Sequence, residues 1–580
     1  MADKNITSFM RSLCMGRIEQ DLLFPFPRFS DDERETLQEV TGAVDDLLGS
    51  HEKDFSKWDD EGDLPGSFIQ ELREFGMFGL VIPEDSGGLG LGNAAYSRTL
   101  QQIARHDGSV AVTIGAHSSI GMRGLLLFGT DDQKKRYYEK LASGEMIAAY
   151  CLTEPGAGSD AASIETKAVQ DGDDWILSGN KLWITNGGIA DFLTVFAKTP
   201  GEGGKGKMSA FIVTRDMDGV SFGPHEDKMG LRASSTTTVH FDDVRVPSEN
   251  VLGEIGKGFK VAMMILNSGR TGLGGGCVGG MKKCIELATA QANQRKTFGQ
   301  PISSYGMMKE KVGQMVVDCY TTEAAVSVVA GLIDGGYDEY AVEAAISKVY
   351  ASECMTRTAD EALQIAGGNG FMKEYPYERI VRDNRINRIF EGTNEILRLF
   401  IALSAMNDVA SQLKQLTKTM KGIFNDPIKG FGVLSGYARK HATLRTGMGE
   451  QSRLSGLHEA LRGPTAVFES GARSLGTAAD RILRKHGKDI IGKQFASKRL
   501  AEIMIDLFVL ASTLSRVQAS IEAVGEEKAG KEIEIAVIFA DQAKRRIERH
   551  LDRIDDNDDE LLKGLAEDAF EAEKFRWDTI

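Results

Sequence analysis

Two segments of the chain place small residues, hydroxyl groups and an aromatic ring where a ligand would approach the backbone. The first, 150–160 (YCLTEPGAGSD), reads as a strand that runs into a Gly-rich loop, whose small side chains leave N–H groups and hydroxyls accessible. The second, 181–188 (KLWITNGG), contains Trp183, a ring suited either to stacking on a ligand or to filling the core of a sheet. By composition alone, a plain Pro-Gly turn and a buried strand aromatic remain alternatives.

A third segment, 388–395 (RIFEGTNE), presents a carboxylate, Glu391, near the start of a predicted helix. A carboxylate buried beside an apolar ligand is a candidate general base, because burial raises its pKa and therefore its affinity for a proton. A solvated glutamate is the alternative interpretation, since acidic residues are common in the first turn of a helix.

Other chemical motifs are disfavoured. Gly274, Gly276 and Gly279 satisfy G-x-G-x-x-G by spacing, but a dinucleotide fingerprint follows a strand, whereas this stretch has helical periodicity. The sequence has no G-x-x-x-x-G-K-[ST] phosphate loop, and its nine histidines form no cluster with metal-ligand spacing, so we predict no metal site. The six cysteines are far apart and include no C-x-x-C pair, which argues against a disulfide framework.

These segments lie in a chain whose texture changes along its length. Helical periodicity covers 31–141 and returns over 259–405, and the intervening 145–253 contains β-rich runs separated by turn residues, typical of an antiparallel sheet or barrel. The clearest runs are 175–177, 192–197, 210–213 and 237–241. Residues 406–580 form a further helical block. We therefore predict a mainly α protein with a central β domain and an additional C-terminal helical domain.

Length and composition limit the class of protein. A chain of 580 residues with 42% hydrophobic and 26% charged residues is typical of a globular protein with several domains. No apolar run approaches about 18 residues, and the N-terminus lacks a signal or transit pattern, so we expect a soluble, non-secreted protein of a bacterial cytoplasm or an organelle matrix. The net charge of −15 disfavours nucleic acid as a partner.

Five ordered segments together resemble the signature motifs of the acyl-CoA dehydrogenase family. The loop at 150–160 and the segment at 181–188 are similar to that family's YCxTEPGAGSD and WITN motifs. Downstream, 295–299 (RKTFG), 364–370 (QIAGGNG) and 388–395 are similar to its RxxFG, QxxGGxG and IxEGTxE motifs. The helical extension at the C-terminus makes the very-long-chain branch of the family the nearest resemblance.

The resemblance implies an enzyme that binds FAD and removes a proton from Cα and a hydride from Cβ of an acyl-CoA thioester, the first step of fatty-acid β-oxidation. Glu391 matches the family's catalytic base, and its backbone N–H matches a donor to the thioester oxygen. The implied FAD contacts are Tyr150, Leu152, Thr153, Ser159, Trp183, Ile184, Thr185, Arg295, Phe298, Gln364, Gly368, Thr393 and Glu395. The implied substrate contacts are Ser159, Asn267, Arg270, Phe390, Gly392, Ala111 and Gly115.

Two details bear on the base. Some family members carry it on an earlier helix, but the matching stretch here, 267–270 (NSGR), contains no carboxylate, which leaves Glu391. Arg270 resembles a residue that holds the CoA end of the substrate and tunes the base, with a surface arginine as the alternative. A separate departure concerns FAD: medium- and short-chain members usually carry a glutamine eight residues after the RxxFG phenylalanine, and Gly306 stands there in this chain. The very-long-chain branch shares this change, which weakens one implied FAD contact.

Chain length can be predicted from two small residues. Ala111 and Gly115 are four residues apart and share a helix face. They match positions where medium-chain members carry glutamine and glutamate, which close the acyl pocket. We therefore predict a preference for long or very long acyl chains, each extra buried methylene contributing about 0.8 kcal/mol. Tight helix packing is the alternative reason for small residues here.

The resemblance also implies partners and boundaries. Arg295, Phe298, Gln364 and Gly368 would bind the adenosine-diphosphate half of FAD from a neighbouring subunit, which implies a homodimer, and electrons would pass to electron-transfer flavoprotein. The basic, amphipathic segment at 411–446 suits an anionic membrane surface or, equally, packing on its own domain. The predicted divisions are 1–30, 31–147, 148–258, 259–410, 411–446 and 447–580.

Two alternative functions remain open at this point. An acyl-CoA oxidase would carry out the same desaturation but pass electrons to oxygen, with hydrogen peroxide as the product. A membrane-associated assembly scaffold would need the chain only as a structural element.

Overall fold

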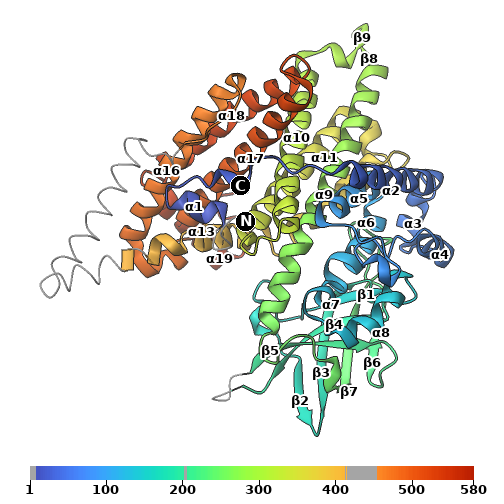
Figure 1. Ribbon diagram of the computed structural model, residues 1–580. Helices are drawn as coiled ribbons and strands as arrows, with labels where there is room; N and C mark the ends of the chain where they lie inside the picture. The colour runs from blue at the N-terminus through green and yellow to red at the C-terminus, as the bar shows by residue number, and fades with distance from the viewer. Residues whose placement is uncertain (1–7, 202–205, 412, 415–452, 580) are drawn as a thin grey trace, which may run out of the picture. The chain divides into compact units, whose positions relative to one another are not determined.

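The computed structural model describes residues 8–201, 206–411, 413–414 and 453–579, which divide into two compact units (Figure 1). The first unit is Phe26–Ile396, and the second contains the described parts of Asn5–Pro25 and Leu397–Ile580. Residues 8–25, predicted to be part of an N-terminal extension, thus belong to the second unit. Apart from residues 411, 413 and 414, the predicted basic segment lies outside the described residues.

The first unit begins with a helical region whose helix starts are set by local capping. Ser30 and Glu33 form a capping box at α2, and Thr130 and Gln133 form another at α8. The helices are α2 (Asp31–Ser50), α3 (Phe55–Glu61), α4 (Gly66–Glu74), α5 (Asn93–His106), α6 (Gly108–Gly115), α7 (Arg123–Phe128) and α8 (Asp131–Ala142). A π-helical turn, η3 (Ala116–Gly121), links α6 to α7. Such turns are rare and often lie at functional sites.

A seven-stranded sheet follows, in the order β1-β4-β2-β3-β7-β6 with β5 paired to β4 (Figure 1). Its strands are β1 (Ala148–Cys151), β2 (Lys167–Asp171), β3 (Asp174–Thr185), β4 (Phe192–Thr199), β5 (Lys207–Thr214), β6 (Val220–Phe222) and β7 (Thr236–Pro247). All four β-rich runs predicted from the sequence lie in these strands. Most of β4 is buried, which explains its continuous apolar run.

The predicted antiparallel sheet is partly wrong, because the sheet is mixed. β1 pairs with β4 in parallel register, Ala148 opposite Phe192, and β2 also meets β4 in parallel at Lys167 and Lys198. The remaining pairs are antiparallel. Local turn signals reveal hairpins between neighbouring strands, whereas the β1–β4 pairing joins strands separated by two others in the chain.

A helical bundle completes the first unit. It contains the long helices α9 (Gly258–Gln294), α10 (Gly306–Asp334) and α11 (Ala341–Ala366) (Figure 1), followed by the short helix α12 (Tyr377–Asn384). A two-stranded hairpin, β8 (Lys296–Thr297) and β9 (Gln300–Pro301), joins α9 to α10, and α13 (Asn394–Ala405) begins at the end of the unit. Gly274, Gly276 and Gly279 lie inside α9, which confirms that they are not a dinucleotide fingerprint. A Cβ at Gly279 would meet the Gln101 carbonyl oxygen at 2.0 Å, so glycine here permits close packing of α5.

The second unit is built from α1 (Phe9–Cys14), α16 (Arg462–His486), α17 (Gln494–Val524), α18 (Gly530–Asp552) and α19 (Asp559–Ala572). The ring of Phe9 packs on Phe468 and Phe508, which ties the N-terminal helix to α16 and α17. An ion pair between the buried Asp506 and the partly exposed Arg546 joins α17 to α18. The order of helices, sheet, helical bundle and extra helical domain confirms the predicted fold class.

Two helical stretches, 108–128 and 306–334, are long and apolar enough to cross a membrane by length and composition. More than half of the apolar window of each is buried within the protein. Core helices of globular proteins have the same properties. All six cysteines are buried, and no disulfide joins any two of them in the described part of the chain.

Candidate active site

Glu391 lies in the turn that connects α12 to α13. Its φ is 55° and that of Gly392 is 95°, so two consecutive residues adopt the left-handed region. Glycine adopts this region freely, whereas for glutamate it costs about 1–3 kcal/mol and persists only when neighbouring contacts enforce it. Strain of this kind is common where a side chain must be aimed at a ligand.

The carboxylate of Glu391 is enclosed although the residue as a whole is only half-buried. Its Oε2 atom is buried and has no hydrogen-bond partner among the described residues. Burial raises the pKa of Glu391 to about 7, against the opposing positive charges of Arg270 and Lys348. A carboxyl group that titrates near neutral pH is suited to accept a proton from a weakly acidic carbon.

Arg270 on α9 is buried, so the alternative of a surface arginine is wrong. Its Nη2 donates to the carbonyl oxygen of Glu391 at 3.4 Å, and its Nη1 donates to Oδ1 of Asn267 at 2.6 Å. Burial lowers the pKa of Arg270 to about 10, with Glu391 and Tyr150 acting in the opposite direction, so the guanidinium stays charged. The structure therefore brings together Glu391, Arg270, Asn267 and Tyr150.

Lys348, on α11, is a member of this cluster that we did not predict. Its Nζ donates to the carbonyl oxygen of Gly392 at 2.8 Å and to Oδ1 of Asn394 at 2.9 Å. Burial lowers the pKa of Lys348 to about 8, and the nearby Glu391 opposes that shift. One signal was available in the sequence: a lone lysine in the apolar run 344–351, where a buried charge requires partners.

The two motifs of the β domain are joined by a buried ion pair. Lys181 is fully buried, and its Nζ donates to Oε1 of Glu154 at 2.6 Å and to the carbonyl oxygens of Leu152 and Phe196. The Leu182 N–H also donates to the carbonyl oxygen of Thr153 at 2.9 Å. These bonds hold the loop after β1 beside the end of β3, where the predicted cofactor contacts lie.

The predicted contacts in these motifs differ in exposure. Trp183 has φ of 55° and 63% of its surface exposed, so it is not a core aromatic of the sheet. Leu152 and Ile184 are buried, Tyr150, Thr153 and Thr185 are half-buried, and Ser159 is exposed. A Cβ at Gly156 or Gly158 would meet no atom within 4 Å, so the loop leaves its backbone open to a ligand.

α6 approaches this site through the π-helical turn. A Cβ at Gly269, on α9, would lie 3.6 Å from Oε1 of Glu391 and 2.9 Å from Cγ2 of Ile120, which places η3 next to the carboxylate. Ala111 packs against the core of the helical region, whereas a Cβ at Gly115 would meet no atom within 4 Å. The structure thus leaves open space beside Gly115.

Four predicted cofactor contacts lie far from Glu391 within one chain. Arg295 caps the C-terminal end of α9, 25 residues after Arg270, a distance of about 37 Å along the helix. Phe298 lies in the β8–β9 hairpin with 92% of its surface exposed. Gln364 and Gly368 are exposed at the end of α11 and in the following turn. The structure therefore does not bring these residues into the site of the same chain.

The remaining predicted contacts lie next to Glu391 in the sequence. Phe390 and Thr393 are half-buried, and Oγ1 of Thr393 accepts a 3.4 Å hydrogen bond from the N–H of Ile396. Glu395 is exposed in the first turn of α13.

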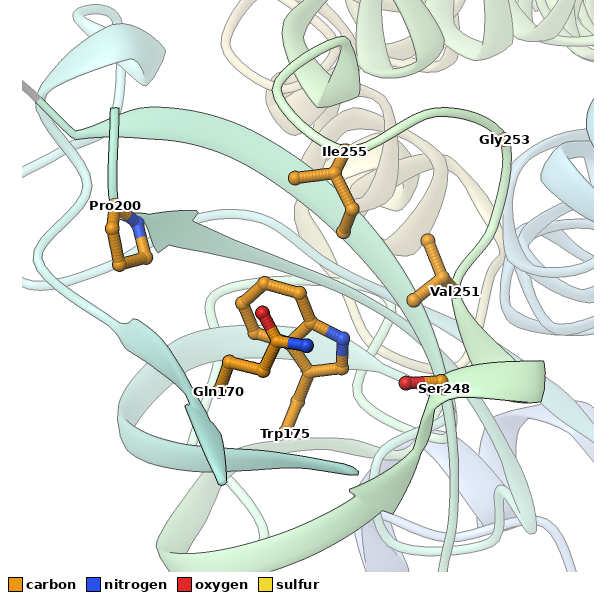
Figure 2. A pocket seen from close by; sticks show the side chains of 7 residues that line it. All are labelled: Gln170, Trp175, Pro200, Ser248, Val251, Gly253 and Ile255. Carbon is orange, nitrogen blue, oxygen red and sulfur yellow. The ribbon is translucent and has the colours of Figure 1, made fainter. Parts of the chain in front are cut away.

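A separate open groove, with a volume of about 570 Å³, lies on the β domain (Figure 2). Its lining residues are Gln170, Trp175, Pro200, Ser248, Val251, Gly253 and Ile255. None of them carries a titratable side chain, so this groove lacks the groups needed for acid–base chemistry.

Comparison with known proteins agrees with the geometry. Family profiles match residues 30–145, 149–244 and 256–406 as the N-terminal, middle and C-terminal domains of acyl-CoA dehydrogenase, and residues 459–575 as "ACAD9/ACADV, C-terminal domain". The chain is 44% identical to the very long-chain specific acyl-CoA dehydrogenase, mitochondrial, of Bos taurus over 523 residues, which cover 89% of this chain and 79% of that protein.

Solved structures show the same likeness. An acyl-CoA dehydrogenase from Bacillus anthracis complexed with FAD has a TM-score of 0.80 and 34% identity, covering 94% of this chain and 91% of its own. The butyryl-CoA dehydrogenase of Megasphaera elsdenii has a TM-score of 0.62 and 34% identity, covering 65% of this chain and 99% of its own.

The chain belongs to the acyl-CoA dehydrogenase family. It is accordingly a flavin-dependent oxidoreductase with acyl-CoA as its substrate class and FAD as its cofactor, which confirms these predictions. Its own residues fit the flavin: the exposed face of Trp183 lies at the end of β3, the hydroxyls of Thr153 and Ser159 lie in the adjoining loop, and Gly156 and Gly158 leave that loop open.

Proposed function

We propose that Glu391 is the general base that removes the Cα proton of a long-chain acyl-CoA. The observation that carries this proposal is the enclosed carboxylate, whose pKa burial raises to about 7 between two cations. Glu391 would begin the reaction deprotonated and would accept the Cα proton on one of its carboxylate oxygens. When bound, FAD supplies the acceptor for the Cβ hydride.

We assign the thioester end to the residues around the base. The backbone N–H of Glu391 would donate to the thioester oxygen, where negative charge develops as the proton leaves, and one such donor contributes roughly 3 kcal/mol in other enzymes. Arg270 supports this arrangement because it holds the Glu391 carbonyl oxygen and places a buried positive charge beside the carboxylate. Arg270, Asn267, Phe390, Gly392 and Ser159 would line the passage for the CoA end.

We propose long or very long acyl chains as substrates. Support comes from the open space beside Gly115 on α6, close to the π-helical turn that borders Glu391, and from the relatives named very long-chain specific. Ala111 would line the same side of the pocket. A deep apolar pocket gains about 0.8 kcal/mol for each methylene that it buries.

We propose that the enzyme acts as a homodimer in which each chain completes the flavin site of the other. The segments that contain Arg295 and Gly368 also carry large exposed apolar side chains: Phe298, Met307, Phe371 and Met372. Exposed apolar groups in this number are typical of a protein–protein interface. Arg295, Phe298, Gln364 and Gly368 would then bind the distal half of the partner's FAD.

Electron-transfer flavoprotein is the acceptor that we propose, and oxygen is the rival. The two are separated by assaying hydrogen peroxide in air without an added acceptor: stoichiometric peroxide would identify an oxidase. The residues on which a membrane or scaffold role would depend lie largely outside the described part of the chain, so no structural observation favours that role.

The decisive experiment is anaerobic titration of the FAD-loaded protein with acyl-CoAs of increasing length, followed by the loss of flavin absorbance. We expect full bleaching by palmitoyl-CoA, weaker bleaching by butyryl-CoA, and none in a Glu391→Gln variant that retains FAD. Bleaching of Glu391→Gln at the wild-type rate would refute the assignment of the base.

A further inference from the structure

Lys348 is a fully buried lysine in the middle of α11. Burying an ammonium group without hydrogen-bond partners is strongly unfavourable, so the partners of the Lys348 Nζ indicate which part of the structure this lysine holds in place. Both bonds that its Nζ makes, to the Gly392 oxygen and to Oδ1 of Asn394, reach the turn that carries Glu391. A leucine or methionine at this position would supply apolar contacts within α11 but neither of these two bonds.

The bonds from Lys348 fall on the strained part of that turn. Glu391 and Gly392 both have positive φ, and their two carbonyl oxygens accept hydrogen bonds from different helices: Arg270 of α9 bonds the first and Lys348 of α11 bonds the second. Asn394 is held in its turn, because its Nδ2 donates to Oγ of Ser352 at 3.0 Å. Successive peptide groups are thereby fixed from two sides, which determines where the carboxylate points.

The electrostatic surroundings of Glu391 also include Lys348. The titratable groups that face the carboxylate are Arg270 and Cys277 from α9, Lys348 from α11, Tyr96 from α5 and Tyr150 from β1. Only the two cations lower the pKa of Glu391, and both oppose the effect of burial. Removal of either charge should therefore raise the pKa of the base.

We propose that Lys348 is a positioning residue for the reaction: it holds the left-handed turn at Glu391 and Gly392 and so aims the carboxylate at the substrate. This inference rests on the proposed function of Glu391, through which Lys348 acts. A lysine that served only the stability of α11 would leave the chemistry of the base unchanged.

The test compares Lys348→Met with Lys282→Met. Lys282 is a matched control because it is a lysine of the same bundle whose Nζ bonds Glu323 at 2.6 Å and Gln101 at 2.9 Å, away from Glu391. With palmitoyl-CoA we expect Lys348→Met to lose roughly tenfold or more in kcat while KM changes little, since a general base contributes about 10²–10⁴-fold.

Two further readouts distinguish positioning from stability. The midpoint of the rise of kcat with pH should move up by roughly half to one unit in Lys348→Met, because a positive charge near the carboxylate is lost. The kinetic isotope effect with α,α-dideuterated palmitoyl-CoA should increase as proton removal becomes slower. Lys282→Met should show neither change.

A second variant, Lys348→Gln, keeps the proposal testable if Lys348→Met does not fold with FAD. Lys348→Gln keeps an N–H donor for the Gly392 oxygen but removes the charge, so it should retain more of kcat and still show the raised pH midpoint. If either folded variant matches Lys282→Met in kcat, pH midpoint and isotope effect, the inference about Lys348 is overturned. Measuring Glu391→Gln in parallel separates the two proposals. Wild-type turnover in that variant would refute the assignment of Glu391 as the base, whatever the Lys348 variants show.

Discussion

Replacing Gly115 with glutamate tests the predicted depth of the acyl pocket. Gly115 has helical dihedral angles, φ of −62° and ψ of −45°, and a side chain there would enter open space, since a Cβ meets no atom within 4 Å. The new side chain would fill the space of about four methylenes. At about 0.8 kcal/mol per buried methylene, the loss for a chain that needs this space is about 3 kcal/mol, or roughly 100-fold.

The assay is kcat/KM for palmitoyl-CoA and octanoyl-CoA with the Gly115→Glu protein. We expect the value for palmitoyl-CoA to fall about 100-fold and that for octanoyl-CoA to change by less than about threefold. Gly42→Glu is the control, because Gly42 is an exposed helical glycine in α2 with open space around it. An equal loss with both substrates, or no loss with either, would show that Gly115 does not border the acyl chain.

Three further predictions follow from the site. The kcat of the wild type should rise about tenfold per pH unit at low pH and level off above about pH 7, because only deprotonated Glu391 accepts a proton and its pKa is raised to about 7. A kcat that does not change between pH 5.5 and 8 would contradict this prediction. A Gly269→Glu change in a Glu391→Gly background should restore part of the lost turnover, since a Cβ at 269 lies 3.6 Å from the Oε1 atom of Glu391. Turnover no higher than in Glu391→Gly alone would show that a carboxylate at 269 does not reach the position that the Glu391 carboxylate occupies. Lys181→Met should reduce the free energy of unfolding by about 3–5 kcal/mol in urea titrations, because it removes the cation that is paired with the buried Glu154 carboxylate. A loss below about 1 kcal/mol would show that the pair is not important for stability.

Local patterns in the sequence were sufficient to predict most helices and strands and to single out Glu391 as the candidate base. The apolar run of β4 and the helical periodicity of α9 depend on neighbours in the chain, so they could be read directly. Glu391 was found because its motif is continuous in sequence. The enclosure of its carboxylate was an expectation from chemistry, and the structure agrees.

Features that depend on distant parts of the chain were not predicted. Lys348 lies 43 residues before Glu391, and only the packing of α11 brings its ammonium group to the Gly392 carbonyl. The parallel pairing of β1 with β4 joins strands that are not consecutive in the chain. The Glu154–Lys181 ion pair spans 27 residues, and neither residue's type reveals that it is buried.

The central claim is that Glu391 removes the α-proton, and exchange of that proton tests it most directly. A 3-thia analogue of palmitoyl-CoA carries sulfur at the β-position and cannot complete the oxidation, so deuterium uptake at Cα from D₂O reports the base alone. We predict rapid exchange with the FAD-loaded wild type and loss of exchange, to the rate without enzyme, in Glu391→Gln that retains FAD and binds the analogue. Exchange at the wild-type rate in that variant would contradict the account.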